Sequence, residues 1–185
     1  MPFHKTEFHR LFVFEPAIYE DSRGYFFEAY NEKIFQEQNL DIRFVQDNQS
    51  SSAYGVIRGL HFQINPYAQT KLIRVLTGTI LDVALDIRKK SPTYAKFFSI
   101  ELSAENKKQL FIPPGFAHGF SVLSETAEVF YKCDKFYNKE SEAGIRYNDP
   151  LLNIDWKIPA EKVIVSDKDQ KLPLLADCKN NFELT

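Results

Sequence analysis

Cysteine is scarce in this chain, and the spacing typical of metal and redox motifs is missing. The 185 residues include two cysteines, Cys133 and Cys178, and no C-x-x-C pair. Two cysteines do not make a disulfide framework in a chain of this size. Because thiols stay reduced in the cytoplasm, the composition predicts two free thiols in a cytoplasmic protein.

Excess charge of one sign and long apolar segments are also missing. The formal net charge is −2, whereas nucleic acids and anionic membrane surfaces attract strongly positive proteins. The initial segment, MPFHKTEFHR, is charged throughout and lacks the apolar core of a signal peptide. The longest uncharged stretch, residues 109–124, is too short and too rich in proline and glycine to cross a bilayer. We therefore expect no nucleic-acid or membrane partner.

Common nucleotide-binding and hydrolase motifs are absent as well. The chain has no G-x-G-x-x-G, no G-x-x-x-x-G-K-[ST] and no G-x-S-x-G segment. Any chemistry must then come from the side chains themselves or from a metal.

Aromatic residues, by contrast, are abundant, with 17 Phe and 9 Tyr, and they favour strands. In the segment TILDVALDIR, at 79–88, Leu81, Val83 and Leu85 fall on one face and Asp82 and Asp86 on the other. In a small barrel such a polar face can line a ligand cavity.

Similar strand-like runs follow between glycine and proline turn signals, at 56–63, 71–76, 97–102, 110–112, 119–123 and 128–133. Strands and helices do not alternate, which disfavours a doubly wound fold. Short helices are predicted at 31–39, capped by Asn31, and at 103–107. The sequence predicts an all-β sandwich or barrel with a few short helices, and a single domain over 1–185.

Glycine inside a strand is the next local signal. Gly59 interrupts the run 56–63, which predicts a bulge or the close approach of another group. Arg58 and His61 would face opposite ways in a regular strand. A bulge at Gly59 brings both side chains toward one cavity.

Two histidines, His61 and His118, raise the possibility of a metal site. Metal-binding cupin barrels usually use three histidines and a glutamate, with two of the histidines one residue apart. Here Gln63 stands two residues after His61, and Lys71 stands where an acidic ligand is expected. Because a lysine repels a cation and two imidazoles alone bind one poorly, we expect no metal. A metal-dependent cupin enzyme remains an alternative.

Polar segments recur where core strands should be apolar, and together they indicate a pocket lined by cations, amides and imidazoles. They also carry a resemblance to the dTDP-4-dehydrorhamnose 3,5-epimerase family that covers nearly the whole chain in order. The main blocks are D-S-R-G-Y-F-F-E at 21–28, F-V-Q-D-N at 44–48, V-I-R-G-L-H-F-Q at 56–63, Q-T-K-L-I-R-V at 69–75, I-P-P-G-F-A-H-G-F at 112–120, Y-N-D-P at 147–150 and S-D-K-D at 166–169.

The resemblance implies a cupin-like jelly-roll barrel that works as a homodimer without a cofactor, in the third step of dTDP-L-rhamnose synthesis. The implied substrate is dTDP-4-dehydro-6-deoxy-D-glucose, epimerised at C3 and C5. Protons at these carbons are acidic because each lies next to the C4 ketone. Inversion needs a base, a group that holds the enolate and an acid on the opposite face.

The resemblance also implies the catalytic residues. His61 matches the base, Asp169 its carboxylate partner, Lys71 the cation at the enolate oxygen and Tyr131 the acid. Asp167 is a rival for Asp169, because both acids lie in one short segment. Each of these side chains has an ordinary alternative role, as a core, rim or surface residue.

The substrate-binding residues are implied in the same way. They supply cations for a diphosphate, amide and carboxylate contacts and one aromatic surface: Arg23, Phe26, Glu28, Gln46, Asn48, Arg58, His118, Glu142 and Lys168. In the family an N-terminal segment reaches into the neighbouring subunit, so Arg23 and Glu28 are expected to serve the partner's pocket. One departure from the family is Tyr147, where relatives often have tryptophan.

Two other functions compete with the double epimerase. A single-carbon epimerase of a related nucleotide-linked keto sugar would use the same His61–Tyr131 pair. A catalytically silent sugar-nucleotide binding module is disfavoured, because His61, Lys71 and Tyr131 are all present.

Overall fold

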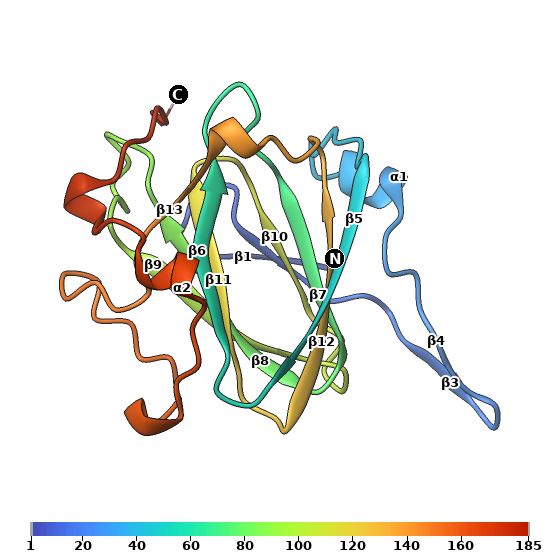
Figure 1. Ribbon diagram of the computed structural model, residues 1–185. Helices are drawn as coiled ribbons and strands as arrows, with labels where there is room; N and C mark the ends of the chain where they lie inside the picture. Colours follow the sequence, from blue (N-terminus) through green and yellow to red (C-terminus); the bar gives the residue numbers. More distant parts are fainter. Residues whose placement is uncertain (1, 185) are drawn as a thin grey trace.

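Two antiparallel sheets face each other as a barrel in the computed structural model, which describes residues 2–184 (Figure 1). The first sheet has the order β1-β2-β10-β7-β12-β5, and the second has the order β13-β6-β11-β8-β9. Their strands are β1 Phe3–Lys5, β2 Phe12–Phe14, β5 Gln46–Ala53, β6 Ile57–Gln63, β7 Lys71–Thr77, β8 Thr79–Asp86, β9 Phe97–Ser103, β10 Gln109–Ile112, β11 Phe116–Val122, β12 Thr126–Cys133 and β13 Glu142–Gly144. The fold is the predicted cupin-like jelly roll.

All seven strands predicted from the sequence are present, with ends shifted by a few residues. The strand β5 was missed because its sequence, QDNQSSSA, is polar on both faces. The strand β5 lies at the edge of its sheet, paired to β12. One face of β5 is exposed, and the other faces the mouth of the barrel. Neither face therefore carries an apolar signal.

The alternation in β8 separates two apolar clusters. Leu81, Val83 and Leu85 pack outside the barrel under the C-terminal segments, together with Trp156 and Phe182. The opposite face points into the barrel, where Ile80 and Ala84 join the central core. Asp82 and Asp86 are on that inner face and have no exposed surface. The predicted polar face thus lines the interior and is more deeply buried than the pattern alone indicates.

The predicted bulge at Gly59 is confirmed. In the pairing of β6 with β11, His61 lies opposite His118 and Arg58 lies opposite Phe120, with a register shift between them. Gly59 has a φ of +121°, in the region that favours glycine. The extra residue shifts the register of β6 between Arg58 and His61. His61 lines a pocket at one end of the barrel, whereas the exposed Arg58 side chain bonds to Ser52 on β5 and does not line that pocket.

Short helices lie around the barrel. Asn31 caps α1, Glu32–Gln36, which buries Phe35 against the outer face of the first sheet. Near the other end of the chain Ser166 caps α2, Asp167–Gln170. The remaining helical segments are single 3₁₀ turns, η1 Lys139–Ser141, η2 Ala160–Lys162 and η3 Leu175–Asp177.

The predicted helix at 103–107 is wrong. Ser103 ends β9, and its side chain and that of Asn106 each accept a hydrogen bond from the other's backbone N–H. Such side-chain bonds to the backbone compete with helix formation and close a turn instead.

One hairpin extends away from the barrel. Strands β3, Tyr19–Asp21, and β4, Gly24–Phe26, pair only with each other and project from the lower right of the molecule in Figure 1. Tyr19 and Phe26 each expose 66% of their surface. No helix within residues 2–184 is long and apolar enough to span a membrane.

Candidate active site

A pocket of about 190 Å³ opens at one end of the barrel, where β5, β6, β7 and β12 converge. Six of the residues predicted from the sequence line it: His61, Lys71, Tyr131, Gln46, Asn48 and Glu142. A larger hollow of about 500 Å³ lies along the β3–β4 hairpin. It holds none of the catalytic candidates, so the chemistry of the lining and not its size identifies the candidate site.

His61 and Asp169 form the central pair of this pocket. The Nε2 atom of His61 is 2.7 Å from Oδ1 of Asp169, and the other carboxylate oxygen accepts a 3.1 Å hydrogen bond from the backbone N–H of Gly59. The carboxylate is buried, whereas His61 keeps a third of its side chain exposed. Asp167, the alternative partner, is exposed on the first turn of α2.

The environment of Asp169 keeps it ionised. Burial alone would raise the pKa of its carboxyl, but the hydrogen bonds from His61 and from the Gly59 N–H outweigh that effect and lower the pKa. An ionised carboxylate can only accept hydrogen bonds. Nε2 of His61 must therefore carry the proton in this contact, which leaves the lone pair of the neutral ring on Nδ1.

Lys71 and Tyr131 come from the neighbouring strands β7 and β12. The Nζ atom of Lys71 is 5.9 Å from the centre of the Tyr131 ring. Burial lowers the pKa of Lys71, while Cys133 and the carboxylates of Asp82 and Glu142 act in the opposite direction. Burial also raises the pKa of Tyr131, which keeps its hydroxyl protonated at neutral pH. The pocket thus holds the Lys71 amine near a proton donor.

A second His–Asp pair lies deeper in the barrel. His118 is 7% exposed, and its Nε2 is 3.0 Å from both carboxylate oxygens of Asp82. Asp82 thus anchors His118. Since His118 is also the cross-strand neighbour of His61, this pair forms part of the wall behind the pocket.

Glu142 and Lys168 form an ion pair at the mouth of the pocket. Glu142 accepts hydrogen bonds from the Lys168 ammonium and, at 3.0 Å, from the Tyr137 hydroxyl. Both contacts lower the pKa of Glu142 against the effect of its burial. Arg58 reaches across to β5, where its Nε donates a 3.0 Å hydrogen bond to Ser52. Its side chain stays exposed.

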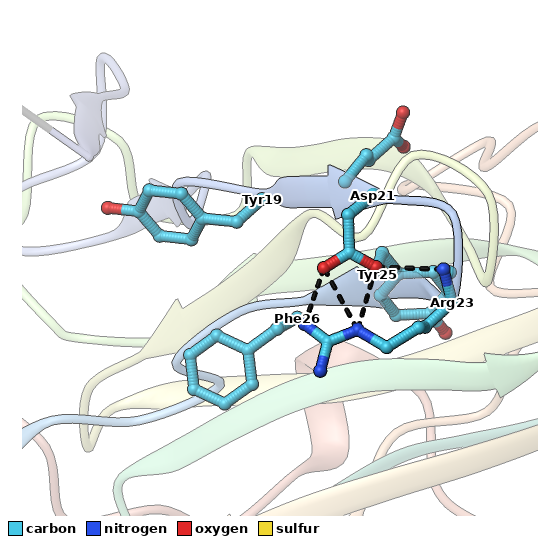
Figure 2. A pocket seen from close by; sticks show the side chains of 7 residues that line it. Tyr19, Asp21, Arg23, Tyr25 and Phe26 are labelled. Carbon is cyan, nitrogen blue, oxygen red and sulfur yellow. Dashed lines mark hydrogen bonds and ion pairs between the residues drawn. The ribbon is translucent and has the colours of Figure 1, made fainter.

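Three predicted binding residues lie away from this pocket. Arg23 and Phe26 are on the hairpin, and Glu28 follows it, where it accepts a hydrogen bond from Asn31. Figure 2 shows the Arg23 guanidinium held against the Asp21 carboxylate, with Phe26 beside it. Within one chain the structure does not bring these residues to His61.

Several pocket residues were missed or only weakly indicated by the sequence. Gln63 and Gln69 line the pocket, but they were read only as evidence against a metal or as part of a polar segment. Cys133 lies behind Lys71, accepts a 3.7 Å contact from the Asn48 amide and has its pKa raised by burial to about 11. Alternation on β12 could have indicated Cys133, because it shares a face with Tyr131.

Among residues 2–184 no group of three or more His, Cys, Asp or Glu side chains could hold a metal ion. The Nε2 atoms of His61 and His118 are each directed to a carboxylate, which occupies the ring nitrogen with a hydrogen bond. The contact with Asp169 orients the ring of His61, which the sequence predicts as the base.

Comparison with known proteins gives consistent results. The family model described as dTDP-4-dehydrorhamnose 3,5-epimerase matches residues 5–177. The protein of that name from Shigella flexneri is 52% identical over 166 residues, which cover 89% of this chain and 91% of that protein.

Solved structures agree with the sequence comparison. The dTDP-4-dehydrorhamnose 3,5-epimerase from Elizabethkingia anophelis superposes with a TM-score of 0.91 at 54% identity, covering 95% of this chain and 96% of the other. A 3,5-epimerase from Legionella pneumophila, solved in complex with dTDP-4-keto-L-rhamnose, has a TM-score of 0.90 at 47% identity, with 95% and 93% covered.

Proposed function

Since this chain belongs to the dTDP-4-dehydrorhamnose 3,5-epimerase family, we propose that the pocket around His61 inverts C3 and C5 of a dTDP-linked 4-keto-6-deoxy sugar. The chain is an isomerase of the dTDP-L-rhamnose route. The observation that carries the assignment is the His61–Asp169 contact in a pocket that also holds Lys71 and Tyr131.

His61 serves as the base in this proposal. Asp169 accepts the Nε2 proton, so Nδ1 is the nitrogen that takes a proton from C3 or C5. The imidazolium that forms is stabilised by the buried carboxylate beside it, as in other His–Asp pairs. The backbone N–H of Gly59 fixes the carboxylate and thereby the plane of the ring.

Lys71 stabilises the enolate. Removing a proton next to the ketone places negative charge on the C4 oxygen, and a fixed cation in a partly desolvated pocket lowers the energy of that charge. The carboxylates of Asp82 and Glu142 favour the charged form of Lys71, but burial is the larger effect and lowers the pKa of this amine.

Tyr131 returns the proton on the opposite face of the sugar. Its raised pKa means that the hydroxyl is protonated at neutral pH and can donate to the carbanion carbon. The phenolate left behind is re-protonated from solvent through the open mouth of the pocket, and the His61 imidazolium gives its proton to solvent by the same route. Both inversions use the same pair, with the sugar ring turned between them.

The diphosphate needs more cations than one pocket supplies. Lys168 bonds to Glu142 at the mouth and Arg58 lies on the same strand as His61, whereas Arg23, Phe26 and Glu28 lie on or next to the projecting hairpin. We infer a homodimer in which each hairpin enters the partner's pocket and adds these three side chains to it. The exposed Tyr19 and Phe26 support this inference, since large exposed apolar side chains mark interaction sites.

Proton exchange in D₂O tests the function directly. The purified protein is mixed with dTDP-4-keto-6-deoxyglucose, with no metal or NAD added, and followed by proton NMR. Deuterium entering both C3 and C5 is the expected result. Deuterium at one carbon alone would make the chain a single-carbon epimerase, and no exchange would contradict the assignment. The cytoplasmic location remains a prediction.

A further inference from the structure

The connection between β6 and β7 joins the strand that carries His61 to the strand that carries Lys71. Residues 64–70 run from the end of β6 to Lys71, which is the first residue of β7. The two strands belong to different sheets of the barrel. The course of this connection therefore helps to set where Lys71 lies relative to His61 in the pocket.

The connection is well held at the end next to Lys71 and exposed in its middle. Gln69 donates a 2.8 Å hydrogen bond to the Lys135 carbonyl, and the backbone N–H of Thr70 donates a 2.7 Å hydrogen bond to the Asp134 carboxylate. Residues 65–67 are exposed, and a hollow of about 410 Å³ lies beside them. A stretch with little packing of this kind opens easily unless other contacts hold it.

The C-terminal tail, residues 180–184, binds this exposed stretch. The Asn181 side chain accepts a 3.0 Å hydrogen bond from the Asn65 N–H and donates a 3.2 Å hydrogen bond to the Asn65 carbonyl. One amide thus satisfies both backbone groups of one residue, as a neighbouring strand would. The family model matches residues 5–177, so the tail lies beyond the matched part of the chain.

The tail is itself anchored to the barrel. Phe182 is 5% exposed and packs edge-on against Phe62, with 6.0 Å between the ring centres. The Phe182 carbonyl accepts a hydrogen bond from the Lys89 N–H, and the Leu184 N–H donates one to the Lys89 carbonyl. Phe62 lines the pocket next to His61. Since a chain end bonded in this way does not fray, the tail can hold the connection in place.

We propose that the tail is a strap that positions Lys71 relative to His61 through the 64–70 connection. Asn181 is then a positioning residue, because it acts through Asn65 and not on the substrate. Small movements are enough to matter, since a misplacement of about 1 Å in a catalytic group can lower a rate by about 100-fold. This inference rests on the proposed function, because it concerns the placement of groups in the same pocket.

Asn181→Ala is the test variant, because its side chain is exposed and its loss leaves the Phe182 packing intact. Hydrogen–deuterium exchange followed by mass spectrometry measures the strap without any substrate. We expect the amides of residues 64–70 to exchange at least about fivefold faster than in the wild type, whereas those of β12 keep their rates.

Kinetics of the same variant measure the consequence for the reaction. We expect kcat to fall by about tenfold, while Kd for dTDP stays within about twofold, because the cations and amides assigned to the nucleotide are untouched. Deuterium entry at C3 and C5 and net inversion should fall by the same factor, since Lys71 acts on the enolate that both require.

Two further variants separate positioning from general damage to the tail. Glu183→Ala removes an exposed 2.9 Å ion pair with Lys90 from the same tail and leaves the bonds to Asn65 in place, so it should change neither measurement. In a double-mutant cycle, Asn181→Ala should add little to the slow deuterium entry of Lys71→Ala, because the strap acts through that side chain.

The outcomes that overturn the proposal differ from those that overturn the proposed function. Unchanged amide exchange at 64–70, additive losses in the cycle, or an equal loss in Glu183→Ala would each contradict the strap. A rise in Kd for dTDP at unchanged kcat would also contradict it. Absence of proton exchange at C3 and C5 in the wild type would contradict the proposed function instead, and the amide measurement would still report whether Asn181 holds the connection.

Discussion

At the scale of single residues, the base and the acid of the proposed mechanism can be told apart by what each does to isotope exchange. His61→Ala removes the group that abstracts the proton, so it should abolish deuterium entry from D₂O at C3 and C5. Tyr131→Phe keeps the base and the enolate cation and removes only the donor hydroxyl. We expect it to lower net inversion by about 100-fold or more while exchange persists. An equal fall of exchange and inversion in Tyr131→Phe would contradict its assignment as a dedicated acid.

The pKa of Asp169 gives a prediction for stability against pH. Its folded-state pKa lies below the ordinary value, mainly because His61 and the Gly59 N–H bind the ionised form against the effect of burial. A carboxyl with a lowered pKa stabilises the fold above its unfolded pKa, and this contribution is lost as the pH falls through the folded value. The difference in unfolding free energy between the wild type and Asp169→Asn should therefore shrink as the pH falls from about 5 to about 3.

Urea unfolding of the two proteins at several pH values measures that difference. A difference that stays constant over this range would mean that the carboxyl titrates alike in the folded and unfolded chain. The same variant should also lose at least about 100-fold in activity at neutral pH, because the amide no longer holds the His61 ring in the tautomer that leaves Nδ1 free.

Residue-level sequence reasoning identified the pocket but not all of its contacts. The choice between Asp167 and Asp169 stayed open, because the partner His61 is more than a hundred positions away in the chain. The choice depends on α2, where Ser166 accepts a hydrogen bond from the Asp169 N–H and the first turn directs Asp169 inward and Asp167 to solvent. A turn of four residues carries no periodic signal from which that direction could be read.

At the scale of elements, the bulge in β6 determines where the base points. Gly59 packs so closely on β11 that an added Cβ would lie 2.6 Å from the Gly119 Cα and 2.8 Å from the His118 carbonyl oxygen. Both contacts are with backbone atoms, which cannot move aside without shifting the strand that carries His118. Gly59→Ala should therefore lower the free energy of unfolding by at least about 2 kcal/mol and reduce activity as well.

Gly24 provides a matched control for this substitution. Its φ of +122° is nearly the same as that of Gly59, but nothing lies within 4 Å of a Cβ placed there. Gly24→Ala thus reports the backbone strain alone. Its melting temperature should lie between those of the wild type and Gly59→Ala. An equal fall in melting temperature in the two variants would mean that the close packing of Gly59 against β11 adds nothing to the cost of Gly59→Ala.

Elements differed in how far the sequence predicted them. Strands with one apolar face, such as β8, were located because burial imposes a period of two on the sequence. The edge strand β5 was missed because its polar residues face solvent on one side and the pocket on the other. The helix expected at 103–107 failed because Ser103 and Asn106 bind the backbone more locally than a helix allows. In β5 and at 103–107, polar side chains and not apolar burial decide the local conformation.

At the scale of the whole molecule, the proposed homodimer makes each pocket depend on the hairpin of the other chain. If Arg23 acts in the partner's pocket, two inactive chains can restore each other. In a mixed dimer of Arg23→Ala and His61→Ala, the pocket with intact His61 receives Arg23 from the other chain. After unfolding and refolding an equal mixture, roughly one quarter of the wild-type inversion rate should return, because half of the dimers have one complete site.

A second mixture tests whether recovered activity comes from a hairpin that enters the partner's pocket. His61 and Tyr131 line the same pocket of one chain, so a mixed dimer of His61→Ala and Tyr131→Phe has no complete site and should not regain inversion. Recovery in the Arg23 mixture but not in this one requires that the hairpin crosses between subunits. If neither mixture recovers while mixed dimers are present by mass spectrometry, Arg23 serves its own chain or no pocket at all, and the role of the hairpin in the proposed dimer is wrong.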